Sequence, residues 1–298
     1  MANTGTTTKL EFATLYGLRD LDSGLWGRAM DVSPELAEEW LTDREGQNRT
    51  INDHRVDEYF RMMKEDYWMI NGEPILFDEN GKLLNGQHRL WATMRYGKTL
   101  QYMVIQVTGD PEALMSTLDQ GKPRSGGDVL VIRGYASGNN VNALGSAIYR
   151  WERGMPFSMR VTPTEMMDTL HRHPDLVKSL SIGRRLSDRF SGSALPSSAL
   201  AALHYLFRKI DEAEADEFFE RLIDGSNLSK GDPVLTLRET IDRNKGPKKL
   251  APRVLYFYTI KAWNAERRRE QLRVLKFLST EAVPEIHGLP SPKIAVGK

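Results

Sequence analysis

The sequence predicts an α+β protein, with a small mixed α/β domain over residues 33–134 and an all-helical domain over residues 135–280. Before residue 134, short apolar runs rich in β-branched and aromatic residues alternate with glycine-containing turns and amphipathic helices. From there to about residue 278, apolar residues recur at helical spacing and strand patterns fade. We expect residues 1–32 to be an N-terminal extension and residues 281–298 to be a C-terminal tail.

Two helices are predicted first in the mixed domain. Ser33 has the residue type of an N-cap and Pro34 follows at the first helical position, so a helix is expected over residues 33–42. Asp53 is the expected cap of a second helix, in which apolar residues recur at spacings of three and four. A break at residues 71–74 ends that pattern.

A β-hairpin, a helix and a strand are predicted next. Residues 75–77 and 82–84 have strand composition, and the polar residues 78–81 between them form the expected turn. A helix then ends at Gly97, a residue type favoured just after helix ends, and residues 100–107 are strand-like. Asp110-Pro111-Glu112 indicates a further helix that stops near residue 121.

Helix starts in the second domain are marked by their caps. Residues 162–165, Thr-Pro-Thr-Glu, match a capping box with proline at the first helical position. Pro196, Asp211 and Asp232 mark three further starts.

Bulk composition excludes several classes of site. The 298 residues include no cysteine, which removes disulfides, thiolate metal sites and cysteine nucleophiles. The six histidines are scattered, so no metal site is expected. The 41 basic and 40 acidic residues give a formal charge of +1, and only a local patch could attract nucleic acid. With no long apolar segment and no signal-like start, we expect a cytoplasmic protein without a membrane partner.

The segment 83–92, Leu-Leu-Asn-Gly-Gln-His-Arg-Leu-Trp-Ala, has the pattern of a strand, a glycine turn and a helix. A helix N-terminus presents unpaired N–H groups and the positive end of the helix dipole to an anion. Gly86 lets the backbone approach closely, and the Arg89 guanidinium could grip phosphate oxygens. The segment therefore predicts a phosphate-binding turn.

The order of elements from residue 45 to residue 107 resembles the N-terminal domain of the ParB and sulfiredoxin superfamily. The resemblance rests on Asn48-Arg49, on Gly72-Glu73-Pro74-Ile75 and on Gly86-Gln87-His88-Arg89, which occur here in that order. It implies a ParB/sulfiredoxin-like fold and a pocket for a nucleoside di- or triphosphate, held by Gly86, His88 and Arg89.

This chain departs from the superfamily at two points. ParB proteins carry Gly-Glu-Arg-Arg at the turn, whereas sulfiredoxins and a group of free-serine kinases carry a His-Arg pair, which is nearer to the sequence here. Gln87 replaces the acidic residue of ParB, which puts a ParB-type CTP switch in doubt. The catalytic cysteine of sulfiredoxin has no counterpart, so that activity is excluded.

A second polar turn, at residues 119–125, could form another wall of the same pocket. It combines Asp119 with the cations Lys122 and Arg124 and the hydroxyl of Ser125, a set suited to phosphate or Mg²⁺-bound phosphate. A plain turn between helices would have a similar composition. If chemistry occurs, Asp119, Asp78 and Glu73 are the candidate bases or metal carboxylates. The phosphate-binding candidates as a whole are Arg49, Gly86, Gln87, His88, Arg89, Lys122, Arg124 and Ser125.

Residues 245–276 are strongly basic, with ten Lys or Arg against two Glu. Such a patch suits contacts with the phosphate backbone of DNA, although a solvated helix face would also produce it. The aromatic residues among these cations fall at helical spacing, which favours core packing over base stacking. The nucleic-acid-binding candidates are Lys248, Lys249, Arg253, Arg267, Arg268, Arg269 and Arg273.

Together these features predict a ParB-like, nucleotide-binding and DNA-associated protein that could form a homodimer, of a kind found among plasmid or phage products. Whether it is an enzyme is left open by the sequence. One alternative is a nucleotide-dependent phosphotransferase resembling free-serine kinases, or a ParB-like nuclease, using Mg²⁺. Another is a protein-interaction module that uses the same basic face.

Overall fold

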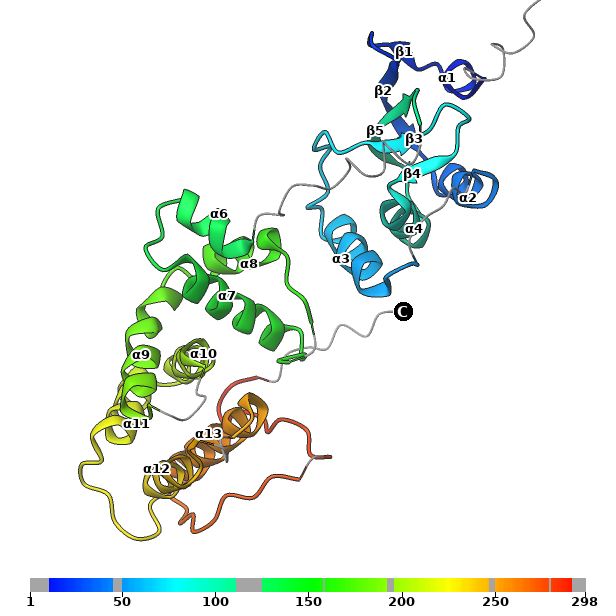
Figure 1. Cartoon of the computed structure of the whole chain (residues 1–298). Helices are drawn as coiled ribbons and strands as arrows, with labels where there is room; N and C mark the ends of the chain where they lie inside the picture. The colour runs from blue at the N-terminus through cyan, green and yellow to red at the C-terminus, as the bar shows by residue number, and fades with distance from the viewer. Residues whose placement is uncertain are drawn as a thin grey trace, which may run out of the picture. The chain divides into compact units, whose positions relative to one another are not determined.

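A computed structural model describes residues 11–44, 50–110, 125–157, 159–191, 196–246, 250–278 and 280–290. The protein is of mixed α+β class and divides into two compact units, Met1–Pro123 and Arg124–Lys298 (Figure 1). We expected the boundary near residue 135. It lies earlier because the segment after residue 125 forms a helix, α6 (Gly126–Ile132), that packs against the first long helix of the second unit.

The N-terminal unit contains one five-stranded sheet and four described helices. The sheet order is β1-β2-β5-β3-β4, in which β3 and β5 are parallel and the other neighbours are antiparallel. Its elements are α1 (Glu11–Leu15), β1 (Arg19–Asp20), β2 (Leu25–Val32), α2 (Pro34–Asp43), α3 (Asp53–Lys64), β3 (Ile75–Phe77), β4 (Leu83–Asn85), α4 (Gln87–Tyr96) and β5 (Leu100–Val107).

Caps and apolar spacing produce these elements largely as predicted. The Ser33 hydroxyl accepts a hydrogen bond from the Leu36 N–H at the start of α2, and Gly97 ends α4 in a left-handed conformation. The cap of α3 is Asn52 rather than the expected Asp53. The helix expected after Asp110 lies outside the described residues.

Residues 1–32 do not form a separate extension, because their described part, residues 11–32, belongs to the sheet domain. All eight residues of β2 pair with β5, from Leu25 with Val107 to Val32 with Leu100. Phe12 is only 3% exposed and packs with Trp40 and Phe77. The pairing joins segments about 75 residues apart, and local sequence patterns carry no information about such a contact.

One face of the sheet carries the core of this unit. Met30, Val32, Tyr102 and Val104 point to that side and pack with Trp40 of α2 and with α4, which also lies against α3. On the opposite face, Leu76, Leu84 and Val107 form a smaller apolar cluster with Ile105.

The C-terminal unit is all-helical in its described residues. It begins with α6, and α7 (Gly138–Glu152) follows. Its later helices are α8 (Pro163–Arg172), a 3₁₀ turn (Leu176–Ser179), α9 (Leu180–Arg189), α10 (Ser197–Arg208), α11 (Glu212–Asp224), α12 (Pro233–Arg243) and α13 (Pro252–Arg267). The capping box predicted at Thr162 and Glu165 is formed, and Asp211 and Asp232 cap α11 and α12 as expected.

Helix α10 lies at the centre of this unit. Every residue from Leu200 to Phe207 is buried, and the helix packs against α7, α9, α11 and α13. Phe207 stacks on Trp263 of α13 with ring centroids 4.3 Å apart. Because Tyr256 and Tyr258 are also buried, the prediction that these aromatic residues pack in the core is confirmed.

In its described part, the basic C-terminal stretch is α-helical only from Pro252 to Arg267. We expected helical structure to about residue 278, but α13 ends at Arg267 and the described residues after it form neither helix nor strand. Arg269 turns the chain with a left-handed φ of 54°.

Candidate functional site

The predicted phosphate-binding turn is formed by the end of β4, Gly86 and the start of α4. Gly86 has a φ of 113°, a conformation that residues with a side chain rarely adopt. A Cβ at this position would lie 2.5 Å from Ile75 Cδ1 and 3.3 Å from Ile75 Cα. Glycine is therefore required both by the backbone conformation and by the close packing of the turn on β3.

Arg89 is a buried structural residue of this turn, rather than an open phosphate ligand. It is 5% exposed, and its Nη1 and Nη2 donate hydrogen bonds to the carbonyl oxygens of Glu73 (2.6 Å) and Pro74 (2.7 Å). A buried charge is costly unless it is hydrogen-bonded, and these two carbonyls provide that compensation. Arg89 thus holds the Gly72–Pro74 segment against the first turn of α4.

The layer beneath Arg89 is also tied together by polar contacts. The Thr93 hydroxyl donates to the Arg89 carbonyl oxygen at 2.9 Å and lies 2.5 Å from the Tyr102 hydroxyl. Burial raises the pKa of Tyr102 to about 12, despite the opposing effect of the hydrogen bond between Tyr102 and Thr93. Tyr102 therefore stays neutral under the turn at physiological pH.

His88 connects the turn to the neighbouring helix. Its Nε2 accepts a hydrogen bond from the backbone N–H of Asn52, the N-cap of α3, at 3.1 Å. Farther along, Arg95 near the end of α4 pairs with Asp57 and lies 4.4 Å from the centroid of the Phe60 ring. The two helices therefore run side by side in the same sense, with their N-termini at the same end.

This pairing creates a positive potential at one point of the molecule. Each helix N-terminus carries a partial positive charge of about half an elementary charge, so two parallel termini reinforce each other. Anions bind readily at such ends. Gly86, Gln87 and His88 on α4 and Asn52 on α3 are the described residues that define this point.

The candidate carboxylates Glu73 and Asp78 are not brought together, because they lie at opposite ends of β3. Glu73 is beside the Gly86 turn and contacts Arg89 through its main chain. Asp78 is 6% exposed, and its Oδ1 accepts from the N–H groups of Asn80 (2.9 Å) and Lys82 (2.7 Å). Asp78 thus fixes the hairpin turn, which is an ordinary role for aspartate.

Most of the expected second wall lies outside the described residues: Asp119, Lys122 and Arg124. Arg49, a phosphate-binding candidate from another loop, also lies outside them. Ser125 is described and caps α6. Its hydroxyl accepts from the Asp128 N–H at 3.2 Å, and the Asp128 carboxylate accepts from the Ser125 N–H at 2.8 Å. These bonds complete a capping box, so Ser125 has a local structural role in the second unit.

Among the described cations of the basic stretch, four are held by contacts within the protein: Lys245 pairs with Asp242, Lys261 pairs with Glu281, and Arg253 and Arg267 have partners of their own. Arg267 pairs with Glu214 and lies over Trp263, and Arg253 donates to the Glu281 carbonyl oxygen at 2.9 Å. In contrast, Arg268, Arg269 and Arg273 are exposed and form no ion pair with another described residue. Lys248 and Lys249 lie outside the described residues.

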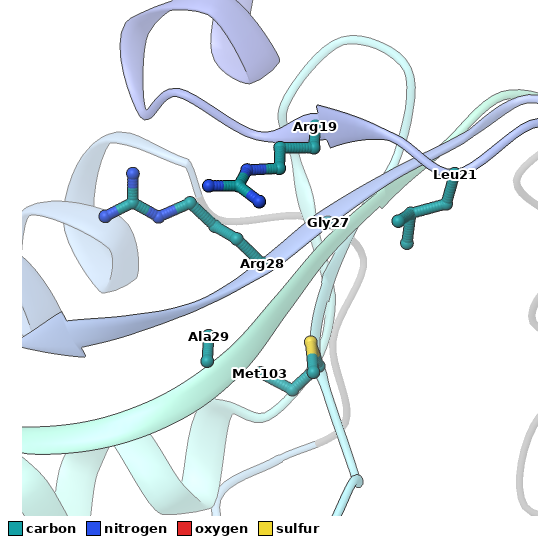
Figure 2. A pocket seen from close by; sticks show the side chains of 6 residues that line it. All are labelled: Arg19, Leu21, Gly27, Arg28, Ala29 and Met103. Atoms are coloured by element: carbon teal, nitrogen blue, oxygen red, sulfur yellow. The ribbon is translucent and has the colours of Figure 1, made fainter.

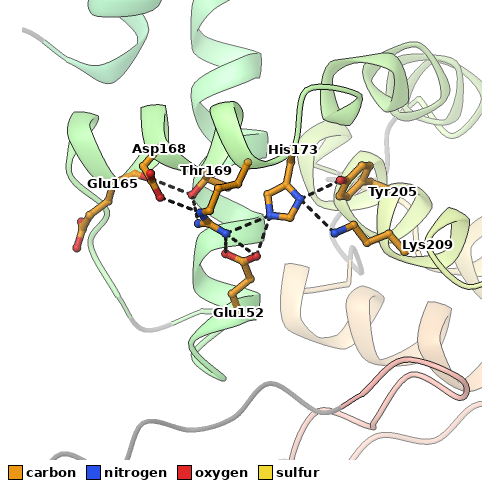
Figure 3. A network of polar contacts seen from close by, with 8 residues as sticks. Glu152, Glu165, Asp168, Thr169, His173, Tyr205 and Lys209 are labelled. Carbon is orange, nitrogen blue, oxygen red and sulfur yellow. Dashed lines mark hydrogen bonds and ion pairs between the residues drawn. The ribbon is translucent and has the colours of Figure 1, made fainter. Parts of the chain in front are cut away.

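Sequence patterns did not reveal two polar networks of the helical unit. In the first, His173 lies between Glu152 (Nε2 to Oε1, 2.8 Å) and Tyr205 (Nδ1 to hydroxyl, 2.9 Å), and Arg172 binds the same glutamate (Figure 3). Burial opposes ionisation of Glu152, but the bonds from His173 and Arg172 outweigh it and lower the pKa of that carboxyl.

The second network has the order serine, histidine, aspartate. The Ser179 hydroxyl lies 2.8 Å from His204 Nδ1, and His204 Nε2 lies 2.9 Å from Asp216 Oδ1. This order matches a hydrolase triad, but Ser179 is completely buried and no substrate could reach its hydroxyl. Burial lowers the pKa of His204 and outweighs the opposing effect of Asp216, so His204 is neutral at physiological pH. The network connects α10, α11 and the 3₁₀ turn by hydrogen bonds.

No known family model, curated protein or solved structure matches this chain. Within the part of the chain that the structure describes, no three His, Asp or Glu side chains group as a metal site would require. A search of the same residues finds no helix with the length and apolarity to cross a membrane.

Proposed function

We propose that the N-terminal unit binds the phosphates of a nucleotide at the joined N-termini of α3 and α4, and that exposed arginines after α13 contact DNA. The observation that carries the nucleotide proposal is the hydrogen bond from Asn52 to His88, which holds two helix N-termini at one point. The ParB/sulfiredoxin-like order of elements supports the same ligand class. A ParB-like, DNA-associated binding protein is therefore our preferred function.

The phosphate contacts proposed here come from the backbone and not from Arg89. Gly86 leaves the first turn of α4 without a side chain at its cap position, and both dipoles favour an anion there. Arg89 contributes by fixing the position of the turn. An Arg89 variant would lose structure and ligand together, so it is a poor test of binding.

A charge introduced at Gln87 separates binding from stability. Glu at the first position of a helix stabilises it by about 0.3–1 kcal/mol, whereas the same charge repels phosphate. Gln87→Glu should therefore weaken nucleotide binding at least about tenfold, equivalent to about 1.4 kcal/mol, without lowering the melting temperature. Isothermal titration of the full chain with ATP, CTP, GTP and ADP, with and without Mg²⁺, measures this effect.

Asn140→Asp is the matched control, because Asn140 is exposed in the first turn of α7 and the substitution also places one carboxylate near a helix N-terminus. We expect it to leave nucleotide affinity unchanged. If the wild-type chain binds none of the four nucleotides, or if Gln87→Glu binds as tightly as wild type, the proposed site is wrong.

The DNA contact is tested by removing the three exposed arginines Arg268, Arg269 and Arg273, each replaced by Gln. Fluorescence anisotropy with a labelled duplex should show at least a tenfold loss of affinity. The control triple variant neutralises three exposed cations elsewhere in the same unit: Arg133, Arg184 and Lys230. Equal losses in the two triple variants would mean that net charge alone attracts DNA, and this part of the proposal would fail.

A further inference from the structure

The sheet of the N-terminal unit carries an open hollow at the edge where β1 pairs with β2. The hollow has a volume of about 590 Å³ and is lined by Arg19, Leu21, Gly27, Arg28, Ala29 and Met103 (Figure 2). Gly27 pairs with Arg19 and Ala29 pairs with Met103, which places these four residues on the side away from Met30 and Val104. Arg28 alternates with Gly27 and Ala29, so its side chain reaches the hollow from the other side of β2, where it passes beside Gly17. None of the lining residues belongs to the Gly86 turn.

Two guanidinium groups dominate the hollow. In Figure 2 the guanidinium ends of Arg19 and Arg28 both lie near the start of β1, and both side chains line the hollow. Both residues are exposed, and neither forms an ion pair or a side-chain hydrogen bond with any other described residue. Two like charges held near each other favour an anion between them.

The rest of the lining is apolar and nearly flat. Ala29 and Met103 provide apolar surface and Leu21 borders it, whereas Gly27 is buried beside the side chains of Leu21 and Ile105. The β1–β2 turn fixes Leu21, whose N–H donates to the Leu25 carbonyl oxygen at 2.8 Å. A volume of this size falls within the range of small-molecule sites, in which an apolar surface buries the ligand body and a few polar groups orient it.

We infer that this hollow binds a small phosphate monoester, with the phosphate held by Arg19 and Arg28 and an apolar group of the ligand on Leu21, Ala29 and Met103. A phosphate dianion matches two guanidinium forks better than a single carboxylate does. The site is separate from the proposed nucleotide site, since the two have no residue in common.

Phenyl phosphate is the probe that combines the two features, and the Met103 methyl group is the reporter. With ¹³C-methyl-methionine labelling of the full chain, the Met103 signal, assigned with Met103→Leu, should shift and saturate on titration. The exposed Met69, which does not line the hollow, should not follow it. Inorganic phosphate and benzoate should each bind at least threefold more weakly, because one lacks the ring and the other lacks the second charge.

Two kinds of variant test separately whether binding needs the two charges and whether it needs the open space of the hollow. The double variant Arg19→Gln, Arg28→Gln should lower affinity for phenyl phosphate at least tenfold. Ala29→Phe should do the same while keeping both charges, because a ring at this exposed strand position fills the hollow. Arg133→Gln with Arg184→Gln is the matched control and should bind like wild type.

The inference is overturned if the Met103 signal does not respond, if either site variant keeps wild-type affinity, or if inorganic phosphate or benzoate binds as tightly as phenyl phosphate. Gln87→Glu should leave this titration unchanged. The proposal for the hollow and the proposal for the nucleotide site can therefore be refuted independently of each other.

Discussion

Replacing Arg89 with Met tests whether the hydrogen bonds of this arginine stabilise the Gly86 turn against the segment before β3. The substitution keeps an unbranched apolar stem but removes the guanidinium, which leaves the carbonyl oxygens of Glu73 and Pro74 without their donors. A hydrogen bond to a charged group is worth about 1.5–3 kcal/mol, and water can replace part of it because Glu73 is exposed. We therefore expect a loss of about 2–4 kcal/mol in the free energy of unfolding of the N-terminal unit.

The expected loss should be visible as a fall of about 10 °C in the melting temperature of that unit. Hydrogen exchange with mass spectrometry shows which part of the unit is destabilised, and we expect the backbone amides of residues 71–77 to lose protection first. Arg95→Met is the control on the same helix, because its partner Asp57 is exposed and such pairs contribute about 1 kcal/mol or less. If the two variants lose equal stability and residues 71–77 keep their protection, the hydrogen bonds of Arg89 do not stabilise the turn.

Three other predictions follow from the described contacts. Gly86→Ala should cost about 2–4 kcal/mol, because it adds a clash with Ile75 to the backbone strain, whereas Gly97→Ala, with no atom near its Cβ, should cost about 1 kcal/mol in the same urea titration. Ser125→Ala should cost about 1 kcal/mol by loss of the α6 cap and leave nucleotide affinity unchanged. His204 has its folded pKa lowered by burial, so its stabilising effect is present above pH 6.5 and is lost as the pH falls below that value. The wild-type unfolding free energy should fall between pH 7.5 and pH 5.5, and His204→Asn should show a smaller fall.

Local signals predicted most of the described helices and three of the strands. Ser33, Thr162 and Asp232 cap helices where their sequence context indicated, since a cap depends only on the next few residues. The strand β5 also has the predicted bounds. In contrast, β2 contains Gly27 and Arg28 and depends on pairing with a distant strand, so its composition did not identify it.

Side-chain direction explains why the candidate site was only partly predicted. The turn itself was predicted, because a glycine between a strand and a helix is a local pattern. Whether Arg89 faces solvent or the protein depends on the carbonyl oxygens of Glu73 and Pro74, which lie in the segment before β3. In the same way, the partners of His173 come from helices α7 and α10, which sequence spacing could not bring together.

The two proposed binding activities should differ in their dependence on salt. At the nucleotide site, the nearby described cations are already engaged, Arg55 by Glu58 at 3.0 Å and Arg89 by main-chain carbonyls. Backbone N–H groups and dipoles would then provide the phosphate contacts, and few counterions would be released. The DNA contact would use three exposed arginines, for which the logarithm of the affinity should fall with the logarithm of salt with a slope of about −2 to −3. Titrations from 50 to 300 mM NaCl, a range of about sixfold around physiological salt, should therefore give a shallower slope for nucleotide than for duplex DNA. An equally steep slope for nucleotide would mean that exposed cations bind its phosphates, contrary to the arrangement of α3 and α4.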